Sequence, residues 1–267
     1  MKVTESASHY SSLDTMSTRE LLEGINREDH CVADAVQGAI PQIENLVEEM
    51  IPRMRQGGRV FYIGSGTSGR LGILDASEIP PTYGAPFDLF IGLISGGDGA
   101  IRKAVEGAED EFDGAWRDLS AYNPGPLDTL IGIAASGSTP YVIGGLNAAR
   151  EAGLLTGCVT CNPDSAVAAA AQIPVVAVVG PEFVTGSTRM KAGTAQKLIL
   201  NMISTSVMIR LGHVHGNKMI DMQLTNAKLV DRGTRMIMEE SGITDYEKAK
   251  ALLLEFGSVR AALDSMK

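Results

Sequence analysis

The chain of 267 residues lacks the features that mark secreted, membrane-bound or nucleic-acid-binding proteins. Its first thirty residues are polar, and no apolar run approaches the ~18 residues that a membrane helix needs. Its formal charge of −9 is carried without a basic stripe, which argues against nucleic acid or an anionic membrane as a partner. These absences predict a cytoplasmic protein.

Cysteine is also scarce. Of the three cysteines, Cys158 and Cys161 have the C-x-x-C spacing but lie in an apolar run typical of a strand. A thioredoxin motif needs its first cysteine at a helix start, and a zinc site needs a second pair of ligands. His213 and His215 form a lone H-x-H, which favours a structural role. We therefore predict reduced, buried thiols in the C-x-x-C, and neither a metal nor another cofactor.

Hydrophobic residues make up 44% of the chain, enough for a substantial core. One stretch organises the rest. Val60–Ile63 predicts a short buried strand, and helical spacing begins at Leu71. Between them, glycines alternate with hydroxyl side chains: Gly64, Ser65, Gly66, Thr67, Ser68 and Gly69. A strand that turns into a helix in this way leaves backbone N–H groups unpaired where the helix dipole favours an anion, so we interpret the turn as a phosphate cradle.

Other interpretations of this turn fit less well. It satisfies G-x-G-x-x-G, but a dinucleotide fold also needs an acidic residue closing the next strand, and Asp88 opens that strand instead. A Walker A loop needs a lysine before the hydroxyl residue, and none is present. A tight turn with solvated hydroxyls explains the loop taken alone equally well.

Further strands are predicted at residues 89–94, 128–134, 155–160 and 174–179, alternating with helices. This order predicts an α/β fold with a doubly wound, parallel, five-stranded sheet. The strand at 128–134 also runs through a hydroxyl-rich turn into a helix, and that turn contains Ser136, Ser138 and Thr139. Two such turns at neighbouring strand ends can converge on one ligand, which strengthens the phosphate interpretation.

Three parts are expected along the chain: residues 1–56, 57–225 and 226–267. The first holds an extended arm, a helix opened by the capping box Ser17–Glu20, and a second helix at 31–55. In the second, the helix after the cradle is expected to end at Pro80, and another helix is expected at 100–109. A third hydroxyl-rich turn at 185–191 precedes a long apolar helix at 192–211. The third part is helical, with a hairpin around Gly257.

The segments 64–72, 75–84, 104–110 and 184–197 closely resemble the N-acetylmuramic acid 6-phosphate etherases, and the likeness runs from about residue 4 to 240. This family belongs to the sugar isomerase (SIS) domain proteins. The resemblance implies a flavodoxin-like SIS fold, a phosphosugar ligand, and hydrolysis of the lactyl ether of N-acetylmuramate 6-phosphate. The products are N-acetylglucosamine 6-phosphate and D-lactate, in the recycling of cell-wall peptidoglycan.

The family's two catalytic glutamates map onto Glu78 and Glu109. An ether is a poor leaving group, so elimination with one carboxylic acid and one carboxylate is the easier route. Glu78 stands beside Ile79 and Pro80, where partial desolvation suits the acid that protonates lactate; Glu109 is then the base at C2. Without the resemblance, Glu109 would be assigned to a solvated helix end. The pairing of the two glutamates is firmer than the division of their roles.

The resemblance also implies the ligand-binding side chains. The phosphate is expected at Ser65, Thr67, Ser68, Ser136, Ser138 and Thr139, which could equally cap their helices. Ser187, Thr188 and Lys191 are expected to close the sugar site, with a third capped turn as the alternative. Two departures stand out: Ser138 replaces the arginine usual in the family, and the segment after Glu240 is shorter than expected.

Two rival functions remain on the same fold. A phosphosugar isomerase needs one base but no acid for lactate, and a phosphosugar sensor such as glucokinase regulatory protein needs neither glutamate. The helices from residues 31 and 192 carry more apolar surface than one sheet face needs, which predicts a homodimer.

Overall fold

The computed structural model describes residues 2–266 and divides them into two compact units. The sheet unit contains residues 2–76 and 90–204, and the C-terminal unit contains residues 77–89 and 205–266. Two helices, α2 (Gly66–Tyr83) and α7 (Lys191–Arg210), contribute residues to both. The domain boundaries expected near residues 56 and 225 stay predictions.

The sheet unit is built on five parallel strands in the order β2-β1-β3-β4-β5. Their bounds are β1 Val60–Gly64, β2 Phe90–Ile94, β3 Thr129–Ile133, β4 Leu155–Thr160 and β5 Ile173–Val176. The chain moves outward in one direction from β1 to β2 and in the other from β3 through β5. The topological switch point therefore lies between β1 and β3, and the predicted doubly wound, flavodoxin-like sheet is confirmed.

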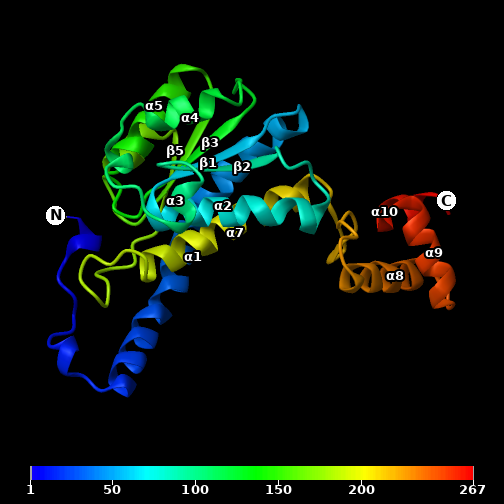
Figure 1. The fold of residues 1–267 in the computed structure, drawn as a ribbon, viewed down its shortest axis with the longest axis horizontal. Helices are drawn as coiled ribbons and strands as arrows, with labels where there is room; N and C mark the ends of the chain where they lie inside the picture. Colours follow the sequence, from blue (N-terminus) through cyan, green and yellow to red (C-terminus); the bar gives the residue numbers. More distant parts are fainter. Residues whose placement is uncertain (1, 267) are drawn as a thin grey trace. The chain divides into compact units, whose positions relative to one another are not determined.

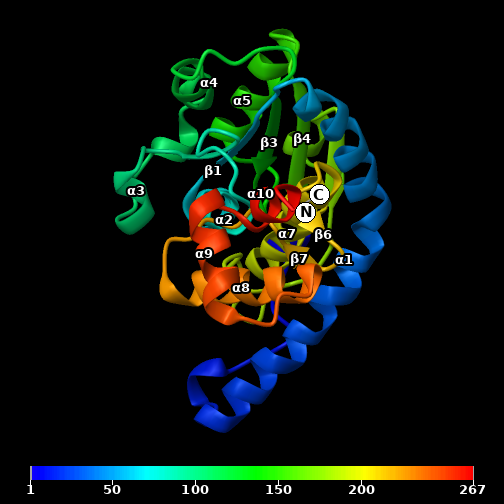
Figure 2. The same ribbon diagram turned by 90° about the vertical axis from the view of Figure 1, so that its right-hand side faces the viewer.

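Helices cover both faces of this sheet (Figure 1). One face carries α4 (Gly114–Ser120), α5 (Pro140–Glu151) and α6 (Ala166–Ala170), which share a core cluster with Phe61 and Leu130. The other face carries α1 (Thr18–Arg55), where Leu46 packs against Gly157 of β4, and the start of α2, where Gly72 packs against Tyr62 of β1. In the view of Figure 2, β3 and β4 lie between α5 and α1. The three central strands, β1, β3 and β4, are therefore buried at every residue, whereas the edge strands β2 and β5 are partly exposed.

A partly buried ion pair between Arg59 and Asp128 aligns the starts of β1 and β3. The Asp128 carboxylate accepts hydrogen bonds from the Arg59 side chain at 2.8 Å, the Arg59 backbone at 2.8 Å and the Gly125 backbone at 2.9 Å. Burial raises the pKa of Asp128, but these donors outweigh it, and the pKa is lowered. Because the two strands start in register, their opposite ends, which lead into the two hydroxyl turns, also lie level.

The structure corrects several expected helices. The two N-terminal helices are one helix, α1, because the polar residues 26–30 interrupt the apolar pattern without including a helix breaker. Helix α2 continues past Pro80 and Pro81 to Tyr83; the missing donors fall in its last turn, where Gly84 N still donates to the Pro80 carbonyl at 2.9 Å. The helix expected at 100–109 ends early, since Lys103 is extended and Gly107 has a φ of +74°. Only α3 (Gly99–Arg102) and a 3-10 turn, η3 (Ala108–Asp110), remain.

Other details of the sequence interpretation hold. The capping box at Ser17 is present, and residues 2–16 before it contain the 3-10 turns η1 (Val3–Glu5) and η2 (Leu13–Thr15). Cys158 and Cys161 are free and buried, as predicted, and burial raises the pKa of each thiol to about 12.

The C-terminal unit packs three helices around its own core: α8 (Ala227–Ser241), α9 (Tyr246–Phe256) and α10 (Val259–Asp264). Ile237, Leu253 and Val259 lie at its centre, and Gly257 turns α9 into α10 as predicted. A small antiparallel ribbon of β6 (Val214–His215) and β7 (Lys218–Met219) precedes them and was missed in the sequence, because two-residue strands carry no periodicity.

Candidate functional site

The first hydroxyl turn (residues 64–69) joins β1 to α2. A Cβ on Gly64 would lie 2.7 Å from the Gly69 nitrogen, and one on Gly69 would lie 2.6 Å from Cγ1 of Ile94. Gly66 has a φ of +55°, which favours glycine. These glycines therefore bring the start of α2 close against β1 and β2, in addition to leaving the backbone accessible.

Two buried polar atoms beside this turn lack partners among the residues that the structure describes. The Ser68 hydroxyl donates to Oε1 of Gln196 on α7 at 3.0 Å, while Nε2 of Gln196 has no acceptor. The hydroxyl oxygen of Ser65 is likewise buried and unpaired. Native proteins pair nearly all such groups, so unpaired ones need an explanation. A bound polar ligand or ordered water at the turn supplies one.

The second hydroxyl turn (residues 135–140) lies beside the first. Gly64, the last residue of β1, pairs with Ile133, the last residue of β3, so both turns leave the sheet from adjacent positions. Ser136 Oγ lies 3.1 Å from Ser138 Oγ, and Ser138 Oγ also accepts a hydrogen bond from the Lys2 ammonium. Thr139 is the N-cap of α5, yet its side chain makes no capping bond. The expected neighbouring turns are confirmed, and the second turn contains a hydroxyl that caps nothing.

The third hydroxyl turn (residues 185–191) is paired internally. The buried Glu182 carboxylate accepts hydrogen bonds from the backbone N–H groups of Lys191 and Ala192, each at 2.9 Å, at the start of α7. The buried Lys191 ammonium forms an ion pair with Glu28 of α1. Burial raises the pKa of Glu28, but Lys191 and other partners outweigh it, and the pKa is lowered. The alternative of a third capped turn therefore describes the backbone here well.

Helix α7 connects the third turn to the first. A Cβ on Gly193 would lie 3.5 Å from Thr67 Cγ2, and the Ser68–Gln196 hydrogen bond lies one turn further along α7. Ser187 and Thr188 are half-buried at the beginning of this contact. The first turn therefore has the second turn on one side, through strand pairing, and α7 on the other.

The two glutamates are both exposed in this chain. Glu109 lies in η3 of the sheet unit, and Glu78 lies on the part of α2 that belongs to the C-terminal unit. Ile79 and Pro80 are buried, but Glu78 is not, so the desolvation expected at Glu78 is absent from the single chain. Consecutive helical residues point about 100° apart, which is why buried neighbours in the sequence do not bury it.

One helical turn before Glu78, α2 carries a buried acid. Asp75 accepts hydrogen bonds from Tyr62 at 3.0 Å and from Ser204 of α7 at 3.1 Å. Burial raises the pKa of Asp75 against the opposing effect of these hydrogen bonds. Asp75 thus fixes α2 to β1 and α7 on the N-terminal side of Glu78.

Sequence reasoning missed three polar residues that support the turns: Asn162, Glu182 and Gln196. Gln196 and Glu182 are almost completely buried, and so is Asn162, which donates to the Ala135 carbonyl at 3.0 Å. The one signal for Gln196 was a polar side chain within the apolar pattern of the helix at 192–211. Asn162 and Glu182 stand in loops, and their sequences carry no comparable signal.

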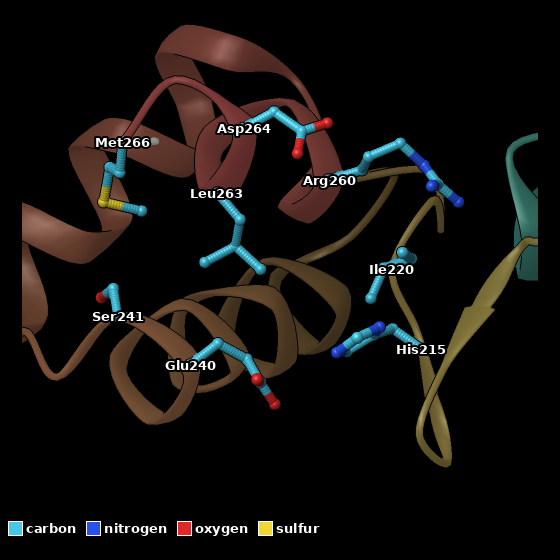
Figure 3. A pocket seen from close by; sticks show the side chains of 8 residues that line it. All are labelled: His215, Ile220, Glu240, Ser241, Arg260, Leu263, Asp264 and Met266. Carbon is cyan, nitrogen blue, oxygen red and sulfur yellow. The ribbon is translucent and has the colours of Figure 1, made fainter.

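The C-terminal unit contains a pocket of about 430 Å³ between α8, α10 and the β6–β7 ribbon (Figure 3). Among the labelled side chains, Leu263 lies between Met266 on one side and His215 and Glu240 on the other. Two of its charged side chains are already paired, Glu240 with Lys218 at 2.9 Å and Arg260 with Asp221 at 2.7 Å. It contains none of the site residues predicted from the sequence.

Comparison with known proteins adds to this geometry. An N-acetylmuramic acid 6-phosphate etherase from Bacteroides fragilis is 63% identical over 267 residues, which cover 100% of this chain and 95% of the relative. The chain belongs to the N-acetylmuramic acid 6-phosphate etherase family. A Porphyromonas gingivalis member is 61% identical over 266 residues (100% and 97% coverage), and one from Salmonella typhi is 50% identical over 261 residues (94% and 88%).

Further comparisons concern the fold. The glucokinase regulatory protein N-terminal SIS domain matches residues 42–150. An Escherichia coli CFT073 protein solved as a ligand complex superposes with a TM-score of 0.54 at 19% identity, covering 76% of this chain and 97% of its own. A phosphoheptose isomerase from Neisseria gonorrhoeae gives 0.54 at 16% identity, with 72% and 98% coverage. Within residues 2–266, no helix is long and apolar enough to cross a membrane.

Proposed function

We propose that this protein cleaves the D-lactyl ether of N-acetylmuramate 6-phosphate, releasing D-lactate and N-acetylglucosamine 6-phosphate. The carrying observation is the full-length identity of 61–63% to etherases from two genera. Two hydroxyl turns lie on paired strand ends, and the buried Ser65 hydroxyl has no partner among the described residues; both observations agree with a phosphosugar ligand. The reaction belongs to the recycling of cell-wall amino sugars.

The proposed mechanism is elimination followed by hydration. Opening of the sugar ring exposes an aldehyde, which acidifies the proton on C2. Glu109 removes that proton, and Glu78 protonates the lactate oxygen as the bond to C3 breaks. Water then adds back at C3. Both carboxyl groups are exposed in the single chain, so the substrate, or a second copy, has to remove water from Glu78 if it is to hold its proton near neutral pH.

The phosphate is proposed to bind between the first two turns, at Ser65, Thr67, Ser68, Ser136, Ser138 and Thr139. Gly66 and Gly137 have positive φ values and lie inside these turns, where open backbone lets an anion approach. Ser187 and Thr188 are proposed to lie over the sugar, while Lys191 holds their turn in place through Glu28.

Release of D-lactate from N-acetylmuramate 6-phosphate tests the function. The wild-type protein is expected to release one D-lactate per sugar, and unphosphorylated N-acetylmuramate is the control. Phosphosugar binding without lactate would instead favour the sensor, which the match to a regulatory-protein domain makes the second candidate. Aldose–ketose conversion without lactate would favour an isomerase.

The division of roles is tested by following deuterium at C2. Glu109→Gln is expected to stop both C2 exchange and lactate release, whereas Glu78→Gln stops lactate release and leaves exchange in place. Each loss is expected to be about 10²–10⁴-fold, the usual contribution of a positioned acid or base. The reverse pattern exchanges the two roles. Solvent ¹⁸O found in lactate, rather than at C3 of the sugar, rules out elimination.

The protein is further proposed to work as a homodimer in the cytoplasm, without nucleic acid or membrane as a partner. Leu22 and Ile40 of α1 are 63% and 45% exposed, and Met202 of α7 is 38% exposed. Apolar residues left open on long helices are typical of subunit interfaces. A fully active monomer, measured by analytical ultracentrifugation at micromolar concentration, contradicts the dimer.

A further inference from the structure

The first residues of the chain are anchored on the second hydroxyl turn. Thr4 is completely buried, its N–H donates to Oδ1 of Asn162 at 3.3 Å, and its hydroxyl accepts from Nδ2 of Asn162 at 2.8 Å. The same Nδ2 donates to the carbonyl of Ala135, the residue before Ser136, at 3.0 Å. Buried polar groups that satisfy one another in this way hold a segment in one position.

The segment is also anchored on the loop that leads into the third turn. The backbone N–H of Ser8 donates to Oγ1 of Thr185 at 2.9 Å, and the Ser8 hydroxyl donates to the Phe183 carbonyl at 2.7 Å. The rings of Tyr10 and Phe183 lie 4.7 Å apart. Residues 2–8, which we term the N-terminal strap, thus run from the second turn to the third with a fixed contact at each end.

The strap brings a positive charge to the second turn. The Lys2 side chain is exposed, and its ammonium donates to Oγ of Ser138, which lies 3.1 Å from Oγ of Ser136. Two cations near the turns are held elsewhere: Lys191 by Glu28, and Arg70 by the carbonyls of Ala100 and Ile101 at 2.8 and 2.7 Å. Arg189 is exposed, but it belongs to the third turn and not to the second. The Lys2 ammonium can therefore reach a ligand without breaking a buried ion pair.

We infer that Lys2 is a substrate-binding residue, whose ammonium contacts the phosphate held by Ser136 and Ser138, and that the strap forms a fixed wall of the site. This inference rests on the proposed function, since it places the phosphate of the sugar at the second turn. A phosphate ester carries nearly two negative charges near neutral pH, and hydroxyl donors alone leave them unneutralised. An ammonium with three donors can bridge the phosphate and Ser138 at once.

The test compares Lys2→Met with Lys2→Arg and with Lys248→Met, a matched control on α9 whose side chain is 78% exposed. Binding of N-acetylglucosamine 6-phosphate is measured by calorimetry, and KM and kcat are measured from lactate release. Lys2→Met is expected to weaken phosphosugar binding and raise KM about five- to tenfold, with kcat unchanged. Lys2→Arg stays within about twofold, Lys248→Met matches wild type, and unphosphorylated sugar shows no difference among them.

A second comparison tests whether the N-terminal strap positions the Lys2 ammonium. Thr4→Val keeps the shape of the side chain but removes the hydroxyl that accepts from Asn162, so the ammonium is less well placed. The variant is expected to weaken phosphosugar binding about threefold in the wild-type background and to add nothing in Lys2→Met. If the losses of affinity from Thr4→Val and Lys2→Met add in the double variant, Thr4 does not act through Lys2.

The outcomes separate the two levels of proposal. If wild type binds the phosphosugar and Lys2→Met binds it equally well, the role of Lys2 is wrong and the function stands. If wild type neither binds the phosphosugar nor releases lactate, the proposed function is wrong and the inference falls with it.

Discussion

The first and third hydroxyl turns look alike in the sequence, with Ser and Thr beside glycine at the start of a helix, yet they differ in how their polar groups are paired. At the first turn, the Ser65 hydroxyl and Nε2 of the adjacent Gln196 are buried without partners among the described residues. At the third, the Glu182 carboxylate accepts from two backbone N–H groups, and Lys191 is paired with Glu28. The protein's own carboxylates occupy the third turn.

This difference separates a binding turn from a structural one. Any helix N-terminus attracts an anion, so the sequence pattern alone does not distinguish a turn that binds a ligand phosphate from one that binds a carboxylate of the protein itself. When an internal carboxylate already satisfies the N–H groups, no ligand is needed. When buried polar groups at the turn have no protein partner, a ligand or an ordered water is needed to pair with them. The predictions below test this division.

The largest expected effect is on stability at the third turn. Lys191→Met leaves the partly buried Glu28 carboxylate without its cation, and we expect the free energy of unfolding to fall by about 3 kcal/mol. Urea denaturation measures it. The kcat and KM of the folded variant are expected to stay within about threefold of wild type.

The double variant Lys191→Met/Glu28→Leu serves as the control. Removing both charges of the pair is expected to restore most of the stability. A double variant that is stable but inactive would show that Lys191 contacts the substrate, which breaks the division between the turns.

Next in size is the loss of phosphate binding at the first two turns. Ser68→Ala and Ser136→Ala each remove a hydroxyl from the site, and a hydrogen bond to a charged group contributes roughly 1.5–3 kcal/mol, so binding of the 6-phosphate is expected to weaken about tenfold or more. Calorimetry with N-acetylglucosamine 6-phosphate measures the loss. Unphosphorylated sugar should show no change; equal weakening of both sugars would mean that these hydroxyls only hold the fold.

A smaller effect concerns pH. The pKa of Glu28 is lowered from its ordinary value of 4.5, because Lys191 and other partners outweigh the effect of burial. A depressed pKa gives stability that is complete above about pH 4.5 and is lost as the pH falls through the folded-state value. The double variant lacks this contribution, so its unfolding free energy should decline less below pH 4.5 than that of wild type. Parallel declines in urea midpoints would contradict the assignment.

The smallest effect is expected for Ser187→Ala. Because Glu182 already accepts from the backbone N–H groups at this turn, loss of the hydroxyl should change KM by only about twofold, with kcat unchanged. Steady-state kinetics beside Ser68→Ala provides the comparison. A loss as large as that of Ser68→Ala would place the third turn among the phosphate-binding turns.

Local sequence signals predicted the sheet well. The run at 155–160 is β4 residue for residue, and the capping box at Ser17 begins α1. These features depend on neighbours in the chain. The expected end of α2 was wrong, because Pro80 and Pro81 stand in the last turn of the helix, where two missing N–H donors do not stop it.

The hydroxyl turns of the candidate site could be predicted from the sequence, but the buried polar side chains that hold these turns could not. Ser68 and Ser136 follow visible strands, whereas Gln196 lies 128 residues from Ser68 and Asn162 lies 158 residues from Thr4. No local pattern encodes such pairs, because they exist only once the sheet brings its strand ends together. Glu78 and Glu109 were found through the family resemblance, and their roles stay predictions.

The hydrogen bond between Ser68 and Gln196 has a consequence for how Ser68 can bind an anion. A hydroxyl has one hydrogen, and that of Ser68 points to Oε1 of Gln196. A phosphate dianion offers none, so Ser68 can donate to it only by turning its hydrogen away from Gln196; the carboxamide can then turn half a revolution and present Nε2 to the serine oxygen. That nitrogen is buried and has no partner among the described residues. Rotation of the buried Gln196 amide would then accompany anion binding. The anion would give the Nε2–H group of Gln196 an acceptor, the Ser68 oxygen, without contacting that group itself.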